Sequence, residues 1–201
     1  MNLEPETENL NEYLKETEII DYNKENIRKT AGDLFAGSRD RADFILNAYE
    51  FVRDKISHII DCHGNRVVCK ASEALDTGYG FCYAKSHLLA AILRCKGVPA
   101  GFCYQKLWFF AGSVPSLVLH GLNGIYIESL KKWIRADARG NKPGVNAQLS
   151  FDNEKLAFHA RRLIGEKDFP VIYAEPVRNV IDRLNQYPLI KDMIRHLPEK
   201  L

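Results

Sequence analysis

The sequence has no hydrophobic run long enough to suggest a membrane segment. Its longest uninterrupted apolar stretch, residues 88–93, is far shorter than the roughly 20 residues with which an α-helix crosses a bilayer. The first 20 residues are acidic and polar, whereas a secretory signal peptide needs an apolar core. We therefore expect no membrane partner and a location in the cytoplasm.

An excess of charge of either sign is also missing. The 28 Lys and Arg residues and the 26 Asp and Glu residues give a formal charge of +2, and the two kinds are intermingled along the chain. Without a basic stripe, we expect no nucleic acid as a partner. A chain of 201 residues buries enough surface to fold as one domain without a metal or a disulfide. We expect no cofactor.

The cysteines do not form a disulfide framework, because five is an odd number and nothing marks the chain as secreted. We predict that Cys95 is in the core and that Cys103 lies within a strand. A loose cluster of ligand-type residues lacks the tight paired spacing of zinc sites and is more simply a loop over a helix. The cluster consists of His58, Cys62, His63 and Cys69.

The order of the predicted elements is helices, then a small antiparallel sheet, then further helical segments, which is typical of an α+β fold. The predicted helices are 23–35 (capped by Asn23 and ended by Gly37), 39–59, 71–75, 82–94, 156–163 and 177–196 with a break at Pro188. The predicted strands are 101–110, 117–127, 133–137 and 171–174. Within a single domain of residues 1–201, we expect an N-terminal helical extension (1–44), a core (45–141) and a C-terminal completion (142–201).

Cys82 begins the helix 82–94, which is apolar on every side and is therefore predicted to be buried. A helix N-terminus favours a thiolate, and its free N–H groups can stabilise an oxyanion. Gly78 and Gly80 leave room for a substrate to approach the sulfur. Free cysteines are more often inert packing, however, so the position of Cys82 needs support from other residues.

A histidine and a carboxylate follow on the predicted strands. A hairpin that places His120 opposite Asp137 has its turn between Glu128 and Ser129, where the sequence is polar. Asp137 then accepts a hydrogen bond from the imidazole and fixes its tautomer. The pair Asn123-Gly124 is an alternative turn signal. That turn leaves too short a return strand, so we predict a bulge there instead.

The segment 71–82, ASEALDTGYGFC, and the segment 93–100, LRCKGVPA, resemble the transglutaminase-like superfamily. The resemblance covers about residues 45–141. It implies a papain-like core in which a buried nucleophile helix packs on a small antiparallel sheet, with extra N- and C-terminal helices. It also implies that Cys82 is the nucleophile, His120 the base and acid, and Asp137 the orienting carboxylate.

Two features depart from the family pattern. Many members have an aromatic residue soon after the histidine, whereas this chain has Gly121-Leu122-Asn123. The paired Cys-x-x-Cys zinc ligands of the glycan-removing branch are missing from the sequence, which argues against glycan amidase activity.

The resemblance and the triad together predict acyl transfer from a peptide or protein amide through a thioester. We favour water as the acceptor, which makes the protein a peptidase or amidase. A protein-glutamine transglutaminase with an amine acceptor and a non-catalytic binding module on the same fold are the alternatives. Tyr79 and Gln105 are candidates for an oxyanion donor or a cleft wall, and Arg139 is a candidate clamp.

Overall fold

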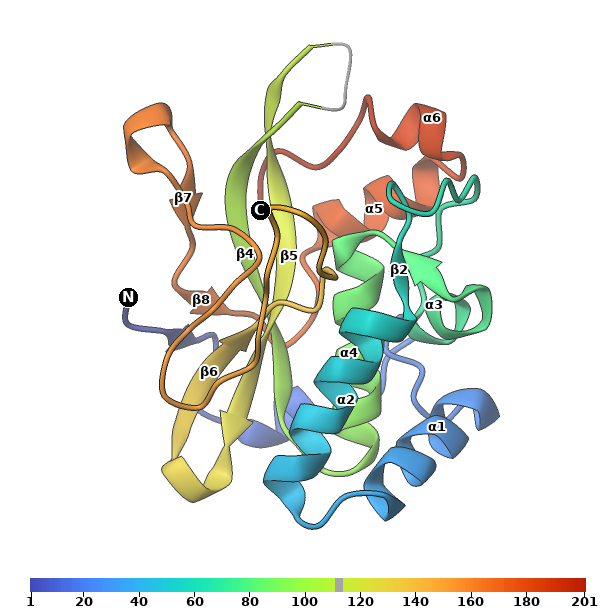
Figure 1. The fold of residues 1–201 in the computed structure, drawn as a ribbon, viewed down its shortest axis with the longest axis vertical. Helices are drawn as coiled ribbons and strands as arrows, with labels where there is room; N and C mark the ends of the chain where they lie inside the picture. Colours follow the sequence, from blue (N-terminus) through green and yellow to red (C-terminus); the bar gives the residue numbers. More distant parts are fainter. Residues whose placement is uncertain (111–113) are drawn as a thin grey trace.

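The computed structural model describes residues 1–110 and 114–201, and these fold into helices packed against a sheet (Figure 1). The helices of the first half are α1 (Glu25–Ala36), α2 (Arg41–Lys55), α3 (Ala71–Thr77) and α4 (Cys82–Cys95). The main sheet has the order β6-β5-β4-β7, and all of its neighbours are antiparallel. Its strands are β4 (Ala100–Phe109), β5 (Ser116–Ile127), β6 (Lys132–Ala136) and β7 (Lys167–Asp168). The predicted α+β class is confirmed.

Helix α4 is the centre of the fold. Every residue from Cys82 to Arg94 is buried, as the apolar pattern predicts. The buried Arg94 guanidinium donates to the carbonyl oxygens of Ala100 and Ala174, so it ties the end of α4 to β4 and to the C-terminal region. The prediction that Cys95 is in the core is wrong, because the last turn of α4 leaves this residue only half-buried.

Strand β5 runs through Asn123 and Gly124 in continuous register with β4, so the predicted bulge is wrong. The Asn123 side chain serves the interior instead, and its Nδ2 donates to the carbonyl oxygens of Ser86 at 3.0 Å and Gly101 at 3.2 Å. Gly124 is needed for close packing, because a Cβ there would lie 2.7 Å from Ile172 Cγ2. Both residues therefore have packing roles, although the pair Asn-Gly resembles a turn signal in the sequence.

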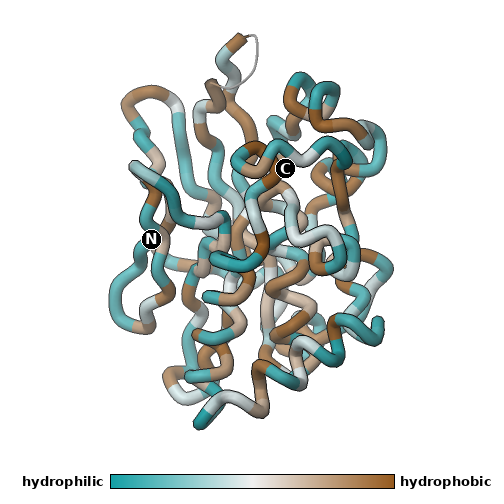
Figure 2. The backbone as a smooth tube through the Cα atoms, turned by 45° about the vertical axis from the view of Figure 1, so that its right-hand side comes forward, coloured by the Kyte–Doolittle hydropathy of each residue, from teal (hydrophilic) through white to brown (hydrophobic). Residues whose placement is uncertain are grey.

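The outer helices follow their local signals with one exception. Helix α1 ends at Gly37 as predicted, but its N-cap is Lys24, because the Asn23 side chain bonds the Glu16 carboxylate instead. Helix α2 begins after Asp40, whose side chain caps it. Many outer loops are hydrophilic (Figure 2). Within the described residues, we find no helix that is both long and apolar enough to cross a membrane.

The N-terminal segment begins with β1 (Glu4–Pro5), which pairs in parallel with β8 (Val171–Ile172). The short 3₁₀ helix η1 (Leu10–Leu14) follows β1. The first 24 residues are therefore less helical than predicted. A second parallel pair joins β2 (Ser57–His58) to β3 (Tyr79–Gly80). The C-terminal helices α5 (Arg178–Gln186) and α6 (Ile190–Met193) lie on either side of Pro188, as predicted. The helix predicted over 156–163 is absent there, and only the short η3 (Arg162–Ile164) forms.

Close packing at Gly101 gives a test of the fold. A Cβ at this position would lie 2.6 Å from the backbone oxygen of Tyr173. Because backbone cannot move aside cheaply, we expect Gly101→Ala to lower the free energy of unfolding by about 1–3 kcal/mol in urea titrations. Gly32→Ala is the control, since it lies inside α1 with no neighbour closer than 3.9 Å. That change should raise the free energy of unfolding by about 0.5–1 kcal/mol. Changes of the same sign would contradict this packing.

Candidate active site

Cys82 is the first residue of α4 and follows directly after Phe81, the N-cap. Its backbone N–H has no acceptor within the helix, as at every helix N-terminus. The segment before it is held by the β2–β3 ladder and approaches α4 closely. A Cβ on Gly80 would lie only 2.9 Å from the Ala84 Cβ. The fold thus places the sulfur at the positive end of a buried dipole, and Cys82 retains 7% exposure.

The last residue pair between β5 and β6 is that of Asn123 with Ala136. His120 lies on β5 beyond this pair, where β5 has no partner in β6. Where β6 no longer pairs, the backbone N–H of Gly121 donates to Cys82 Sγ at 3.5 Å. Glycine is required at this point, because a Cβ would lie 2.8 Å from the Tyr83 ring. Gly121, which directly follows the histidine, therefore lets β5 pass directly against the start of α4.

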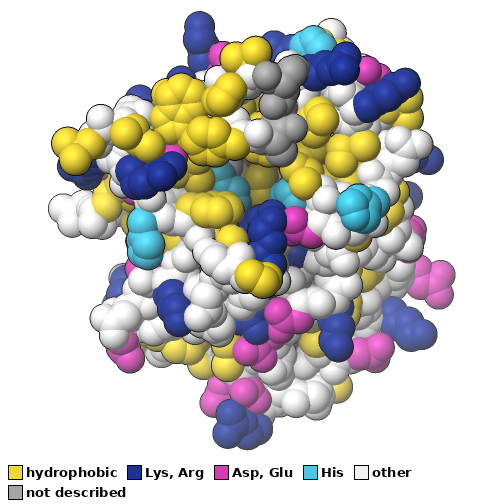
Figure 3. All heavy atoms as spheres, turned by 45° about the horizontal axis from the view of Figure 1, so that its top comes forward, with side chains coloured by type: hydrophobic (Ala, Val, Ile, Leu, Met, Phe, Trp, Pro, Cys, Tyr) yellow, Lys and Arg dark blue, Asp and Glu magenta, His cyan; other side chains and the backbone are white. Residues whose placement is uncertain are grey.

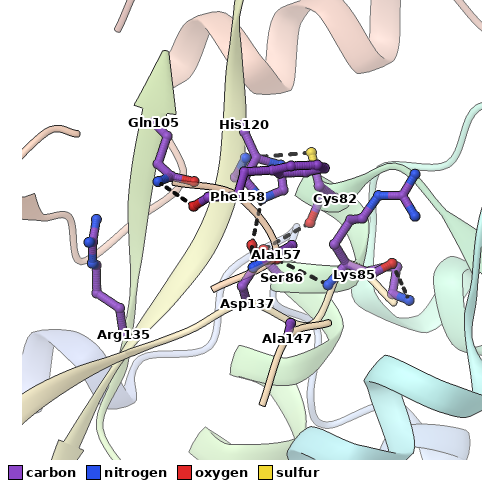
Figure 4. A network of polar contacts seen from close by, with 12 residues as sticks. Cys82, Lys85, Ser86, Gln105, His120, Arg135, Asp137, Ala147, Ala157 and Phe158 are labelled. Atoms are coloured by element: carbon purple, nitrogen blue, oxygen red, sulfur yellow. Dashed lines mark hydrogen bonds and ion pairs between the residues drawn. The ribbon is translucent and has the colours of Figure 1, made fainter. Parts of the chain in front are cut away.

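Asp137 follows β6 immediately and is fully buried at its side chain. Its Oδ2 accepts hydrogen bonds from His120 Nε2 at 2.8 Å and from the Ala157 N–H at 3.1 Å. Its Oδ1 accepts from the Arg139 N–H at 3.1 Å. Three donors thus fix the carboxylate, and the carboxylate fixes the ring (Figure 4).

The register that brings this pair together is shifted from the predicted one. The observed pairs, such as Gly124 with Arg135, extend to place Asp137 beside Leu122 and not opposite His120. The shift is two residues, so the two side chains keep the same face and meet along the diagonal. The predicted direct opposition is wrong, but the predicted contact exists.

The charges of the pair stabilise each other. Burial alone lowers the pKa of His120, but the nearby Asp137 carboxylate and the Cys82 sulfur outweigh it and raise that pKa above its ordinary value. Burial alone raises the pKa of Asp137, and the His120 ring outweighs it and lowers that pKa. Both directions favour an imidazolium bound to a carboxylate. Because Nε2 is bound to Asp137, the ring's other nitrogen, Nδ1, is left for chemistry at Cys82 (Figure 4).

The segment around Phe158 completes the site and was missed by the sequence analysis. The Phe158 ring meets the His120 ring edge to face at 5.2 Å. Gln105 Nε2 donates to the Phe158 carbonyl oxygen at 3.2 Å and to Asp168 Oδ1 at 2.8 Å. The Phe158 carbonyl oxygen and the Ala157 N–H, which bonds Asp137, are thus used in tertiary hydrogen bonds. A helix over 156–163 would need the same backbone groups. Tertiary contacts thus replace the predicted helix.

The two residues proposed for the oxyanion or the cleft lie elsewhere. Gln105 is buried under the Phe158 segment and does not line the cavity at Cys82. The Tyr79 ring packs near Gly64, since a Cβ on Gly64 would lie 3.1 Å from it. Tyr79 does not line the cavity either. Neither side chain therefore forms a wall of the cavity.

Arg139, the candidate clamp, holds a loop. Its guanidinium bonds Asp61, which also bonds Lys142. These contacts hold the loop that follows Asp137 against the loop after β2. Burial raises the pKa of Asp61, but the two cations outweigh it and lower that pKa to about 2.

Lys85 is a buried cation one helical turn after Cys82. Its ammonium donates to the carbonyl oxygens of Arg53 and Ile56 at the end of α2, and to that of Arg139 at 3.0 Å. These three acceptors match the three donors of an ammonium group. Burial, followed by the charge of Arg139, lowers the pKa of Lys85 to about 7.

A cavity of about 670 Å³ opens at Cys82 and His120. Figure 3 shows a hollow bordered by hydrophobic side chains, with histidine side chains inside it. Apolar residues from the β4–β5 hairpin and from the C-terminal region form most of its wall, including Leu107, Trp108, Phe109, Val118, Phe158 and Leu197. The site is therefore accessible to a substrate with a bulky apolar group.

The loose cluster of possible metal ligands does not come together. Cys62 is exposed, whereas Cys69 is buried and its carbonyl oxygen bonds His87 Nδ1. Within residues 1–110 and 114–201, no group of three or more His, Cys, Asp or Glu side chains is arranged to hold a metal ion. His58 alone of the cluster lines the cavity at Cys82.

Comparison with known proteins identifies the family. The model of the transglutaminase-like superfamily matches residues 28–138, more than half of the chain, and the protein therefore belongs to this superfamily. No curated protein matches the sequence.

Solved structures with a similar fold are known. A candidate cysteine protease from Cytophaga hutchinsonii is 18% identical, with a TM-score of 0.53 over 66% of this chain and 43% of that chain. A candidate protease from Parabacteroides distasonis is 12% identical, with a TM-score of 0.40 over 66% of this chain and 28% of that chain. The periplasmic domain of TgpA from Pseudomonas aeruginosa is 16% identical, with a TM-score of 0.41 over 63% and 45%. The matched region thus spans less than half of each of these structures.

The bond between Asp137 and His120 predicts the pH dependence of turnover. Asp137→Asn removes the anion that raises the pKa of His120, so the alkaline limb of kcat/KM should move to lower pH. The value at the optimum should fall by up to about 10⁴-fold, because the ring loses its fixed tautomer. Full pH profiles of kcat/KM measure both effects. Asp33→Asn, which removes an exposed carboxylate on α1, should leave the profile unchanged. An unmoved alkaline limb in Asp137→Asn would refute the assignment.

The buried ammonium of Lys85 predicts a pH dependence of stability. Between pH 7 and 10.5 the unfolded chain binds the Lys85 proton and the folded chain releases it. The free energy of unfolding should therefore rise with pH in this range, relative to Lys85→Met, by up to about 1.4 kcal/mol per pH unit. Urea titrations at several pH values measure the difference. Lys29→Met, at an exposed position of α1, should give curves parallel to the wild type. Parallel curves for Lys85→Met would show that its ammonium keeps its proton on folding.

Proposed function

We propose that this protein is a cysteine hydrolase that cleaves peptide amides through a thioester, with Cys82, His120 and Asp137 as its catalytic triad. The observation that carries the proposal is the hydrogen bond of 2.8 Å between His120 Nε2 and Asp137, formed at the wall of a cavity that also contains Cys82. A pure scaffold has no need to bury an oriented imidazole beside a thiol at the mouth of a cavity.

The geometry supports an acylation step. The Cys82 thiolate attacks the carbonyl carbon, and the developing oxyanion lies near the free backbone N–H at the start of α4. The His120 imidazolium gives its Nδ1 proton to the leaving amine, and a thioester remains on the sulfur. Neutral His120 then accepts a proton from the attacking water, and the thiolate is the leaving group. Asp137 stays ionised and bound to Nε2 through both steps.

The walls of the cavity support a substrate class. Most of its lining is aromatic or aliphatic, which favours a large apolar side chain next to the amide that is cleaved. The charged side chains nearby are paired, Arg161 with Glu166, and both Arg139 and Lys142 with Asp61. One positive charge is left in excess, so a basic residue at the same position is disfavoured.

Water as the acceptor is supported by the similar fold of the candidate cysteine protease from Cytophaga hutchinsonii. An amine acceptor, as in a protein-glutamine transglutaminase, uses the same triad and is the alternative. A location in the cytoplasm and the division at residues 44 and 141 stay predictions from the sequence.

A peptide library with a variable residue before the scissile amide tests the proposal. Incubation with and without an added primary amine, followed by mass spectrometry, separates hydrolysis from amine transfer. We expect new carboxyl termini after large apolar residues, a thioester on Cys82 in acid-quenched samples, and loss of both in Cys82→Ala.

Three outcomes contradict the proposal in different ways. Products that carry the amine in place of a carboxyl group would assign the protein as a transglutaminase. Cleavage that persists in Cys82→Ala would exclude this nucleophile. A wild type that forms neither product nor thioester with any peptide would favour a binding module.

A further inference from the structure

A second histidine, His58, lines the same cavity as Cys82, and the steps above give it no role. His58 is in β2, where parallel pairing places it next to Gly80 of β3. The Ile59 N–H donates to the Gly80 carbonyl oxygen at 3.0 Å and fixes this register. The His58 ring meets the Phe81 ring edge to face at 5.9 Å. The β2–β3 pair thus holds an imidazole against the segment that leads into the nucleophile.

One ring nitrogen of His58, Nδ1, lacks a partner in the described part of the chain. The residue is only 8% exposed, and its Nδ1 is fully buried with no hydrogen-bond partner among the described residues. An unsatisfied buried polar group costs roughly 1–3 kcal/mol, so its presence needs an explanation. Orphaned N–H groups are rarer than orphaned acceptors, which places the proton on Nε2. That tautomer leaves one N–H donor on a ring that lines the cavity with Cys82 and His120.

The charges around His58 keep this donor neutral. Burial and the Arg139 cation hold the pKa of His58 well below its ordinary value, and the opposing charge of Asp61 does not restore it. The positive charges of Lys85 and His120 lower the pKa of His58 further. A neutral imidazole donates a hydrogen bond, but it does not compete with His120 as a proton donor to the leaving amine.

We propose that His58 supplies the second hydrogen bond of the oxyanion hole, beside the backbone N–H of Cys82. This inference rests on the proposed function. As the thiolate forms its bond to the carbonyl carbon, the π electrons of the C=O move to oxygen, and both N–H groups bond that oxygen. When the C–N bond breaks, the electrons return to re-form C=O, and His58 keeps its proton throughout. Tyr79 and Gln105, the other candidates, do not line the cavity.

Two substitutions separate an oxyanion donor from a packing residue. His58→Leu keeps a side chain of similar volume but removes the N–H donor, whereas His58→Gln keeps a neutral N–H donor. Three probes are applied to each variant and to the wild type. Iodoacetamide reports the reactivity of the thiolate without forming an oxyanion. A peptide aldehyde ending in phenylalaninal forms an oxyanion-like adduct, and the matching peptide anilide reports turnover.

We expect His58→Leu to alkylate with iodoacetamide within about twofold of the wild-type rate. Its kcat on the anilide should fall about 10²–10³-fold, the usual loss for one oxyanion donor, with KM little changed. The aldehyde should bind correspondingly more weakly, and His58→Gln should recover at least a tenfold part of kcat.

The outcomes that overturn the inference are distinct from a failure of the proposed function. If His58→Leu retains kcat within about threefold, the side chain gives the oxyanion no hydrogen bond. If iodoacetamide reactivity falls in parallel with kcat, or if His58→Gln recovers nothing while both variants fold, the residue acts through packing. A failure of the proposed function appears instead in the wild type, as no turnover and no aldehyde adduct.

Discussion

The whole site depends on the close contact between the start of α4 and strand β5. Gly121 allows β5 to pass against Tyr83 with no side chain between them, and its N–H then reaches the Cys82 sulfur. The same strand carries His120 one residue earlier. Burial of α4 on all sides prevents the helix from shifting, so the distance between nucleophile and imidazole is set by core packing and not by a mobile loop.

The C-terminal region is part of the site and not an appendage. Ala157 donates to Asp137, and Phe158 covers His120 from the cavity side. Gln105 and Arg135 hold this region through Asp168 and Glu154. The superfamily match ends at residue 138, so the contacts of Ala157 and Phe158 with the triad come from the part of the chain beyond the match.

Much of the framework could be predicted from the sequence, because its signals are local. The all-round apolar pattern of α4, the Gly-Phe-Cys start and the β-type runs around His120 and Asp137 depend on residues close together in the chain. A two-residue turn at Glu128-Ser129 favours glycine or asparagine, and the sequence has neither there. The hairpin instead has a longer turn over residues 128–131, with Lys131 at positive φ, and its register differs by two from the predicted one. That shift could not be predicted from strand patterns, which repeat every two residues.

Several of the errors share a physical cause, since they concern side chains whose partners are distant in the sequence. Asn123 and Gly124 resemble a turn until Ser86 and Ile172 are placed beside them. Tyr79 is near Cys82 in sequence but packs toward Gly64, whereas His58 is distant in sequence and reaches the cavity through a two-residue ladder. Proximity along the chain was therefore a poor guide to which residues line the cavity.

The central claim is that Asp137 holds His120 by Nε2 as an imidazolium beside Cys82. Nitrogen NMR of the His120 ring at neutral pH in the wild-type protein tests it most directly. The account predicts protons on both ring nitrogens and an Nε2 proton shifted to low field by its bond to the carboxylate. A neutral ring at that pH, or an Nε2 that carries no proton, would contradict it.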